Sequence, residues 1–183
     1  MTQSASLTIL GPAPGPDDPL GLLRACHRRL EARLDTLTRV FEVYGRREED
    51  RYDQAAGAIG MVIRHMQGAA KLHNEDEEFS LFPRLIEADP RLGDRLLALE
   101  AEHETTDELW ASLRPVLQEL SEGADPEPGL VARLSPRVEA LVQAHRRHFQ
   151  LEEAEVFRAA ERLLSSEALR SIGEEMAARR QLI

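Results

Sequence analysis

Apolar residues recur along most of the chain at alternating intervals of three and four positions. The first such stretch starts at Asp18-Pro19, an N-cap residue followed by proline at the first helical position. Residues at these intervals lie on one face of an α-helix. The pattern predicts a long amphipathic helix whose inward positions are Leu23, His27, Leu30, Leu34, Leu37, Phe41 and Tyr44.

Three further stretches repeat the pattern, beginning near Tyr52, Leu92 and Leu130. The segments GRREED, ADPRLGD and SEGADPEPG separate them. Short connections between long amphipathic helices place consecutive helices antiparallel. The sequence therefore predicts an all-α fold, an up-down-up-down antiparallel four-helix bundle.

The domain boundaries follow from these stretches. We expect residues 1–18, rich in proline and glycine, to form an extended, flexible tail. Residues 19–165 are expected to form the bundle. Residues 166–183 are expected to form a short C-terminal helix that packs on it, capped by Ser165 or Ser166.

Polar residues interrupt the apolar stripes in a repeated arrangement. The motif HxxxEE, followed two residues later by an apolar residue and phenylalanine, occurs at 73–82 and again at 148–157. A single histidine stands on the preceding helix in each half, 46 residues before the first motif and 45 before the second. The six interrupting residues are His27, His73, Glu77, His103, His148 and Glu152.

These six residues are expected to meet at one level of the bundle. At about 1.5 Å per residue, His27 lies about 27 Å from the end of its helix, and His73 lies about 33 Å from the start of the next. The second helix pair gives about 27 Å in both directions. A chain that turns and runs back therefore brings the polar interruptions close together.

Buried carboxylates require a compensating positive charge. An ionised carboxylate in an apolar core costs several kcal/mol unless it is paired, and no lysine or arginine falls on these stripes near that level. Metal cations supply the charge, and neutral imidazole nitrogens complete a coordination shell. The residue types therefore predict a metal site. A metal-free helical interaction protein is the alternative.

The composition limits the classes of partner that the protein is expected to bind. The formal net charge of −10 argues against nucleic acid or an anionic membrane surface as the main partner. No run of 18 apolar residues suggests a membrane span. A single cysteine, Cys26, forms no intramolecular disulfide. With no signal sequence expected at the N-terminus, we predict a cytoplasmic protein, monomeric or homodimeric.

The arrangement resembles the hemerythrin-like, HHE cation-binding family, whose pattern is H…HxxxE…H…HxxxE. The segment HNEDEEFSLFP matches its H-x-x-x-E-E-x-x-L-F-P signature, and the resemblance covers residues 19 to 165. It implies a non-haem di-iron centre with an oxo or hydroxo bridge. It assigns His27 and His73 to one iron and His103 and His148 to the other, with Glu77 and Glu152 bridging both.

Two departures from the oxygen-carrying hemerythrins bear on function. Those proteins have a fifth histidine one turn after the third-helix ligand, where this chain has Asp107, and an aspartate five residues after its histidine, where this chain has Glu152 at four. The departures argue against reversible oxygen carriage. The resemblance instead implies a protein that reacts with or senses dioxygen, peroxide or nitric oxide. Enzymatic redox turnover, an iron-dependent sensing or interaction module without turnover, and an iron–sulfur cluster repair-like protein remain open.

Several neighbouring residues have alternative roles. His145 lies one turn before His148 and is either a fifth nitrogen ligand or a lining residue. Glu104 and Asp107 either orient or join the site, or lie on a solvated face. Zinc also suits four histidines and two carboxylates. A ferritin-like centre is disfavoured because its Glu-x-x-His motif occurs once, at Glu100.

Overall fold

A computed structural model describes residues 14–181, and within this range the chain forms helices and no β-strand. The predicted all-α class is confirmed. None of the helices in that range combines the length and the apolar character needed to cross a membrane. The elements are α1 (Pro19–Arg46), η1 (Glu49–Arg51), α2 (Tyr52–His65), η2 (Met66–Ala70), α3 (Lys71–Asp76), η3 (Glu77–Leu81), α4 (Phe82–Ala88), η4 (Pro90–Leu92), α5 (Gly93–Ser121), α6 (Leu130–Leu151), η5 (Glu152–Val156), α7 (Phe157–Leu163) and α8 (Ser166–Gln181).

The predicted helix caps are present at the starts of α1 and α8. The Asp18 side chain accepts a hydrogen bond of 2.9 Å from the Gly21 backbone N–H at the start of α1. Ser165 accepts one of 3.1 Å from the Ala168 backbone N–H at the start of α8. Most of the expected N-terminal tail lies outside the described residues, and residues 14–18 form a turn before α1.

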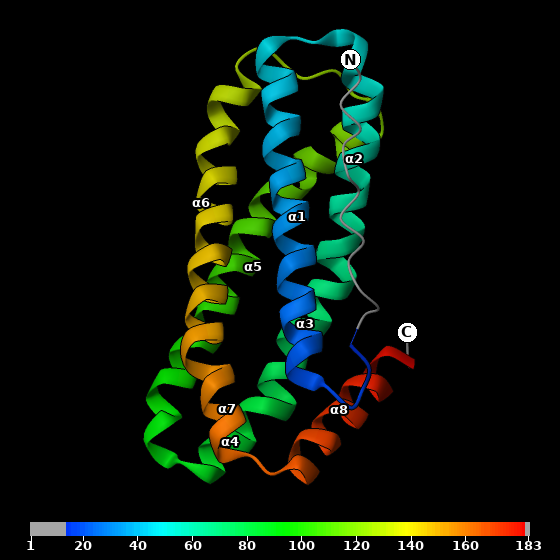
Figure 1. The fold of residues 1–183 in the computed structure, drawn as a ribbon. Coiled ribbons are helices and arrows are strands. Elements are labelled where there is room, and N and C mark those ends of the chain that lie inside the picture. Colours follow the sequence, from blue (N-terminus) through cyan, green and yellow to red (C-terminus); the bar gives the residue numbers. More distant parts are fainter. Residues whose placement is uncertain (1–13, 182–183) are drawn as a thin grey trace, which may run out of the picture.

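The long helices lie side by side around a common core (Figure 1). Helix α1 packs against α2 and α6, and α5 packs against the same two helices. The run from α2 to α4 is continuous, and so is the run from α6 to α7. Helix α8 then crosses near the beginning of α1 and contacts α3 and η3 (Figure 1).

The hydrophobic core is divided into two clusters. The larger one gathers residues between Leu30 and Phe149 from α1, α2, α5 and α6, including Trp110. The smaller one gathers Leu23, Phe82 and Phe157 with neighbours from α4, α5, α7 and α8. The polar interruptions fall between these clusters along every long helix. Apolar layers therefore cover the polar level on both sides.

Three five-residue segments adopt π-helical geometry, namely η2, η3 and η5. Glu77 begins η3 and Glu152 begins η5, so each glutamate of an HxxxE motif stands where the helix widens. π-Helical segments are rare and occur frequently at functional sites. The apolar periodicity did not predict them, because intervals of three and four residues do not distinguish one wider turn from a regular α-helix.

Candidate metal centre

The structure brings all six interrupting residues together in the interior. Their side chains are buried, and both glutamates are 0% exposed. They form two groups, and within each group the potential ligand atoms lie within 4.8 Å of one another. Both glutamates belong to both groups. The first group is His27, His73, Glu77 and Glu152, and the second is Glu77, His103, His148 and Glu152.

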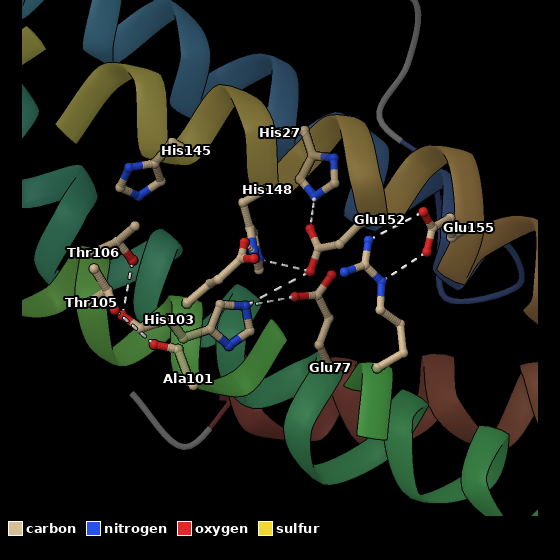
Figure 2. Close-up of polar contacts among 12 residues, drawn as sticks. His27, Glu77, Ala101, His103, Thr105, Thr106, His145, His148, Glu152 and Glu155 are labelled. Atoms are coloured by element: carbon tan, nitrogen blue, oxygen red, sulfur yellow. Dashed lines mark hydrogen bonds and ion pairs between the residues drawn. The ribbon is translucent and has the colours of Figure 1, made fainter. Parts of the chain in front are cut away.

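The Nε2 atoms of His27, His103 and His148 face the two carboxylates, as Figure 2 shows. Glu152 lies closest to the rings, with Oε2 at 3.1 Å from His27 Nε2 and Oε1 at 2.9 Å from His148 Nε2. Glu77 Oε2 lies 3.5 Å from His73 Nε2 and 3.4 Å from His103 Nε2. The four rings therefore direct the same nitrogen to a shared centre.

On three of the rings, Nδ1 contacts a second carboxylate. His27 Nδ1 lies 2.9 Å from Glu153 Oε1 and His103 Nδ1 lies 2.6 Å from Glu78 Oε1. In the same way, His148 Nδ1 lies 3.0 Å from Glu102 Oε2. An ionised carboxylate only accepts hydrogen bonds, so Nδ1 is the donor. In the neutral ring the Nε2 lone pair then points to the centre, as in metal-ligating histidines.

Several inward atoms have no hydrogen-bond partner of suitable geometry among the described residues. They are both carboxylate oxygens of Glu77 and of Glu152, and Nε2 of His103 and His148. Each buried, unsatisfied polar group costs about 1–3 kcal/mol. In addition, His27 Nε2 and His73 Nε2 are 3.1 Å apart, so a proton or a cation must separate their lone pairs. Nitrogen and carboxylate donors arranged in this way fit transition-metal cations.

The two carboxylates differ in acidity. Desolvation, followed by repulsion from Glu152, raises the pKa of Glu77 to about 8. Desolvation also acts to raise the pKa of Glu152, but the imidazoles of His103, His148 and His27 outweigh it and hold that pKa well below its ordinary range. The difference follows from distance, because Glu152 has the closer imidazole neighbours.

The pKa values of the imidazoles depend on burial and on these carboxylates. Desolvation acts to lower the pKa of His103, yet Glu152 and Glu77 outweigh it and raise the pKa to about 11. The pKa of His148 is raised in the same sense, mainly by Glu152. Burial and the nearby His27 keep the pKa of His73 well below its ordinary value. Without metal, a proton on His103 offsets part of the carboxylate charge, so metal binding at its Nε2 must release that proton.

His145 is buried but belongs to neither group. Its Nδ1 donates a hydrogen bond of 3.0 Å to the Leu141 carbonyl oxygen, one turn earlier on α6. Burial lowers the pKa of His145 to about 4. The ring is therefore a neutral group beside the site, in the position that Figure 2 shows.

The other marginal residues lie at the periphery. Glu104 and Asp107 are exposed on α5, which favours the solvated-face alternative. Cys26 is half-buried, and desolvation raises the pKa of its thiol. None of these three residues belongs to either four-residue group.

Sequence reasoning missed the three outer glutamates, Glu78, Glu102 and Glu153. A signal for two of them is present, because each HxxxE motif ends in a doubled glutamate. The periodicity placed only the first member of each doublet on the inward stripe. Glu78 and Glu153 both stand in π-helical segments, η3 and η5, and both contact an imidazole of the site.

The comparisons with known proteins agree with this arrangement. The family described as the hemerythrin HHE cation binding domain matches residues 18–160. A protein of Haemophilus influenzae, named as an uncharacterized protein, is 30% identical over 172 residues, which cover 91% of this chain and 92% of that protein. Two buried groups of histidine and glutamate that could hold metal lie between its helices, and the family match covers most of the chain. This chain therefore belongs to the hemerythrin HHE cation-binding domain family.

Proposed function

We propose that the protein is a non-haem di-iron protein of the hemerythrin-like type, built as an up-down-up-down four-helix bundle, and that it reacts with or senses dioxygen, peroxide or nitric oxide. The observation that carries the proposal is the pair of four-residue groups that share Glu77 and Glu152. Two carboxylates common to two histidine pairs suit two metal ions held side by side.

The residues take distinct roles in this proposal. His27 and His73 hold one iron, and His103 and His148 hold the other. Glu77 and Glu152 bridge the two ions and neutralise part of their charge. When bound, the iron pair supplies two adjacent redox-active Lewis-acidic centres for a small ligand.

The surrounding chain controls what reaches the centre. The two apolar clusters cover the site from both sides and keep the local dielectric constant low, which strengthens the charge interactions within it. His145, neutral and buried one turn before His148 on α6, offers a hydrogen-bonding group to a small polar ligand.

Elemental analysis of the purified protein tests the proposal. We expect two iron ions per chain and visible absorption of a ferric iron pair, both lost in His103→Ala. Glu104→Ala, which changes an exposed residue one position away, is the matched control and should keep the iron. Zinc in place of iron, or one ion per chain in the wild type, would contradict the proposal.

A sensing role without turnover has its own support. Asp76, directly before Glu77, is buried and forms ion pairs of 2.6 Å with Arg179 and 2.7 Å with Arg180 on α8. A change in the position of Glu77 would therefore be transmitted through Asp76 to the C-terminal helix.

Peroxide consumption by the iron-loaded protein, lost in His103→Ala, favours redox turnover. Iron-dependent protection of α8 from hydrogen exchange without peroxide consumption favours sensing.

A further inference from the structure

Two of the three carboxylates that accept from the imidazole Nδ1 atoms link the two halves of the chain, and the third, Glu102, contacts His148 within the second half. Glu78 follows Glu77 in the first half and contacts His103 in the second half at 2.6 Å. Glu153 follows Glu152 in the second half and contacts His27 in the first half at 2.9 Å. Each doubled glutamate thus supplies one carboxylate to the shared centre and one to the lone histidine of the other half.

The hydrogen bonds are distributed unequally between the two groups. In the second group, both imidazoles have such a carboxylate, from Glu78 and Glu102. In the first group, His27 has one from Glu153, whereas His73 Nδ1 has no hydrogen-bond partner within residues 14–181. The near-symmetry of the sequence motif is therefore broken in the surroundings of the two histidine pairs.

The outer carboxylates keep their charge close to the site. Within the described residues, each of the three has a histidine as its ion-pair partner and none pairs with lysine or arginine. Glu155, in the same π-helical segment as Glu153, instead forms an ion pair with Arg95 at 2.8 Å. A carboxylate that accepts a hydrogen bond from the Nδ1 of a metal-binding imidazole fixes the orientation of the ring. It also makes Nε2 a stronger electron-pair donor to the metal.

We propose that Glu78, Glu102 and Glu153 are positioning residues, and that their unequal distribution makes the two metal positions inequivalent. The position formed by His103 and His148 favours the trivalent over the divalent ion more strongly than the position formed by His27 and His73. The redox part of this inference rests on the proposed function. On reduction, the His27/His73 ion accepts the first electron and the His103/His148 ion the second.

Cobalt(II) binding tests the positioning role without iron. Glu78→Ala, Glu102→Ala and Glu153→Ala each remove an acceptor, and we expect each to weaken cobalt(II) binding about 10- to 100-fold. Glu155→Ala is the control and should bind as tightly as the wild type. Thermal unfolding of the metal-free variants checks folding. Wild-type affinity in the three variants would overturn the positioning role.

Redox titration of the iron-loaded protein tests the inequivalence. Glutamine keeps an acceptor oxygen and removes the charge, so the conservative variants retain metal while their potentials change. We expect Glu153→Gln to raise mainly the potential of the first reduction step. Glu78→Gln and Glu102→Gln should raise mainly that of the second, and Glu155→Gln should change neither. Potentials equal to those of Glu155→Gln, or the same step shifted by all three variants, would overturn the inference.

The two proposals fail in distinguishable ways. If the wild type takes up no iron, the proposed di-iron function is wrong, and cobalt(II) affinity still decides whether the outer glutamates position the imidazoles. If the wild type takes up two irons and the glutamine variants leave both potentials unchanged, the di-iron function stands and the inequivalence of the two positions is refuted.

Discussion

Replacing Glu77 by glutamine should have opposite effects on the metal-free and metal-loaded proteins. Glu77 is fully buried, and neither of its oxygens has a hydrogen-bond partner among the described residues. Without metal, burial and repulsion from Glu152 outweigh the attraction of the nearby imidazoles and raise the pKa of Glu77, so its ionised form lowers stability. With metal, the same carboxylate is expected to bridge two cations. Glutamine has almost the same shape and carries no charge, so it separates the two effects.

The magnitude follows from linkage. The pKa of Glu77 is about 8 in the folded chain and its ordinary value is 4.5. The folded pKa is raised, so the favourable contribution is complete below pH 4.5 and is lost as the pH rises through 8. At about 1.4 kcal/mol per pH unit, the loss at pH 8 approaches about 4 kcal/mol. The buried amide of glutamine has an unsatisfied-group cost of about 1–3 kcal/mol, which leaves a net stabilisation of about 1–3 kcal/mol.

Thermal unfolding between pH 6.5 and 8 is the appropriate assay. In this range the pKa of His145, about 4 in the folded chain, adds little slope, because a depressed folded pKa costs stability only below the ordinary value of 6.5. His103, whose pKa is raised to about 11, adds a loss with rising pH in the same direction as Glu77. At about 2–4 °C per kcal/mol for a chain of this size, Glu77→Gln should raise the metal-free Tm at pH 8 by several degrees.

The metal-loaded comparison completes the test. Glu77→Gln should lower the metal-loaded Tm below that of the wild type, because it removes a shared ligand. Glu104→Gln, at an exposed position, controls for loss of a glutamate and should change neither value. If Glu77→Gln destabilises the metal-free protein at pH 8 as much as the metal-loaded one, burial and Glu152 do not outweigh the imidazoles at Glu77 and the reasoning fails.

Three further outcomes follow from the same structure. Rigorous chelation should lower the Tm of the wild-type protein markedly, and more at pH 8 than at pH 6.5; an unchanged Tm counts against a metal centre. Asp76→Ala should lower the free energy of unfolding, measured in urea, by about 2–4 kcal/mol, because it leaves the guanidinium groups of Arg179 and Arg180 without their buried partner. Asp89→Ala is the control. It removes the partner of Arg91, whose side chain is 89% exposed, and should lower the free energy of unfolding far less. His145→Leu should keep both metal ions, since His145 lies outside both ligand groups; loss of one ion by elemental analysis would make it a ligand.

The helices and the inward direction of the six polar residues could be predicted because both are local properties. Intervals of three and four residues assign side chains to a helix face whatever the rest of the chain does. His73 and Glu77 share a face for that reason, and so do His148 and Glu152. The caps at Asp18 and Ser165 are equally local, since each side chain bonds to a backbone N–H three residues later.

The partners of these residues could not be predicted, because they depend on how the helices rotate and shift relative to one another. The contact of Glu153 with His27 spans 126 residues, and that of Arg179 with Asp76 spans 103. No periodicity within one helix specifies which carboxylate of another helix lies opposite an imidazole. The π-helical segments that begin at Glu77 and Glu152 add a further local rotation that the apolar stripe does not reveal.

The amino-acid sequence by itself thus determined an all-α chain with four imidazoles and two carboxylates on inward faces at nearly one level, since helical periodicity and turn residues act over a few positions. Only the tertiary structure decided that Glu78, Glu102 and Glu153 contact three of the four rings and that α8 pairs with Asp76. It also decided that no carboxylate of residues 14–181 contacts His73 Nδ1. The physical reason is that a hydrogen bond between two helices forms only at one relative rotation and one axial position of those helices. The packing of whole helices and the charge pairs between distant residues determine both.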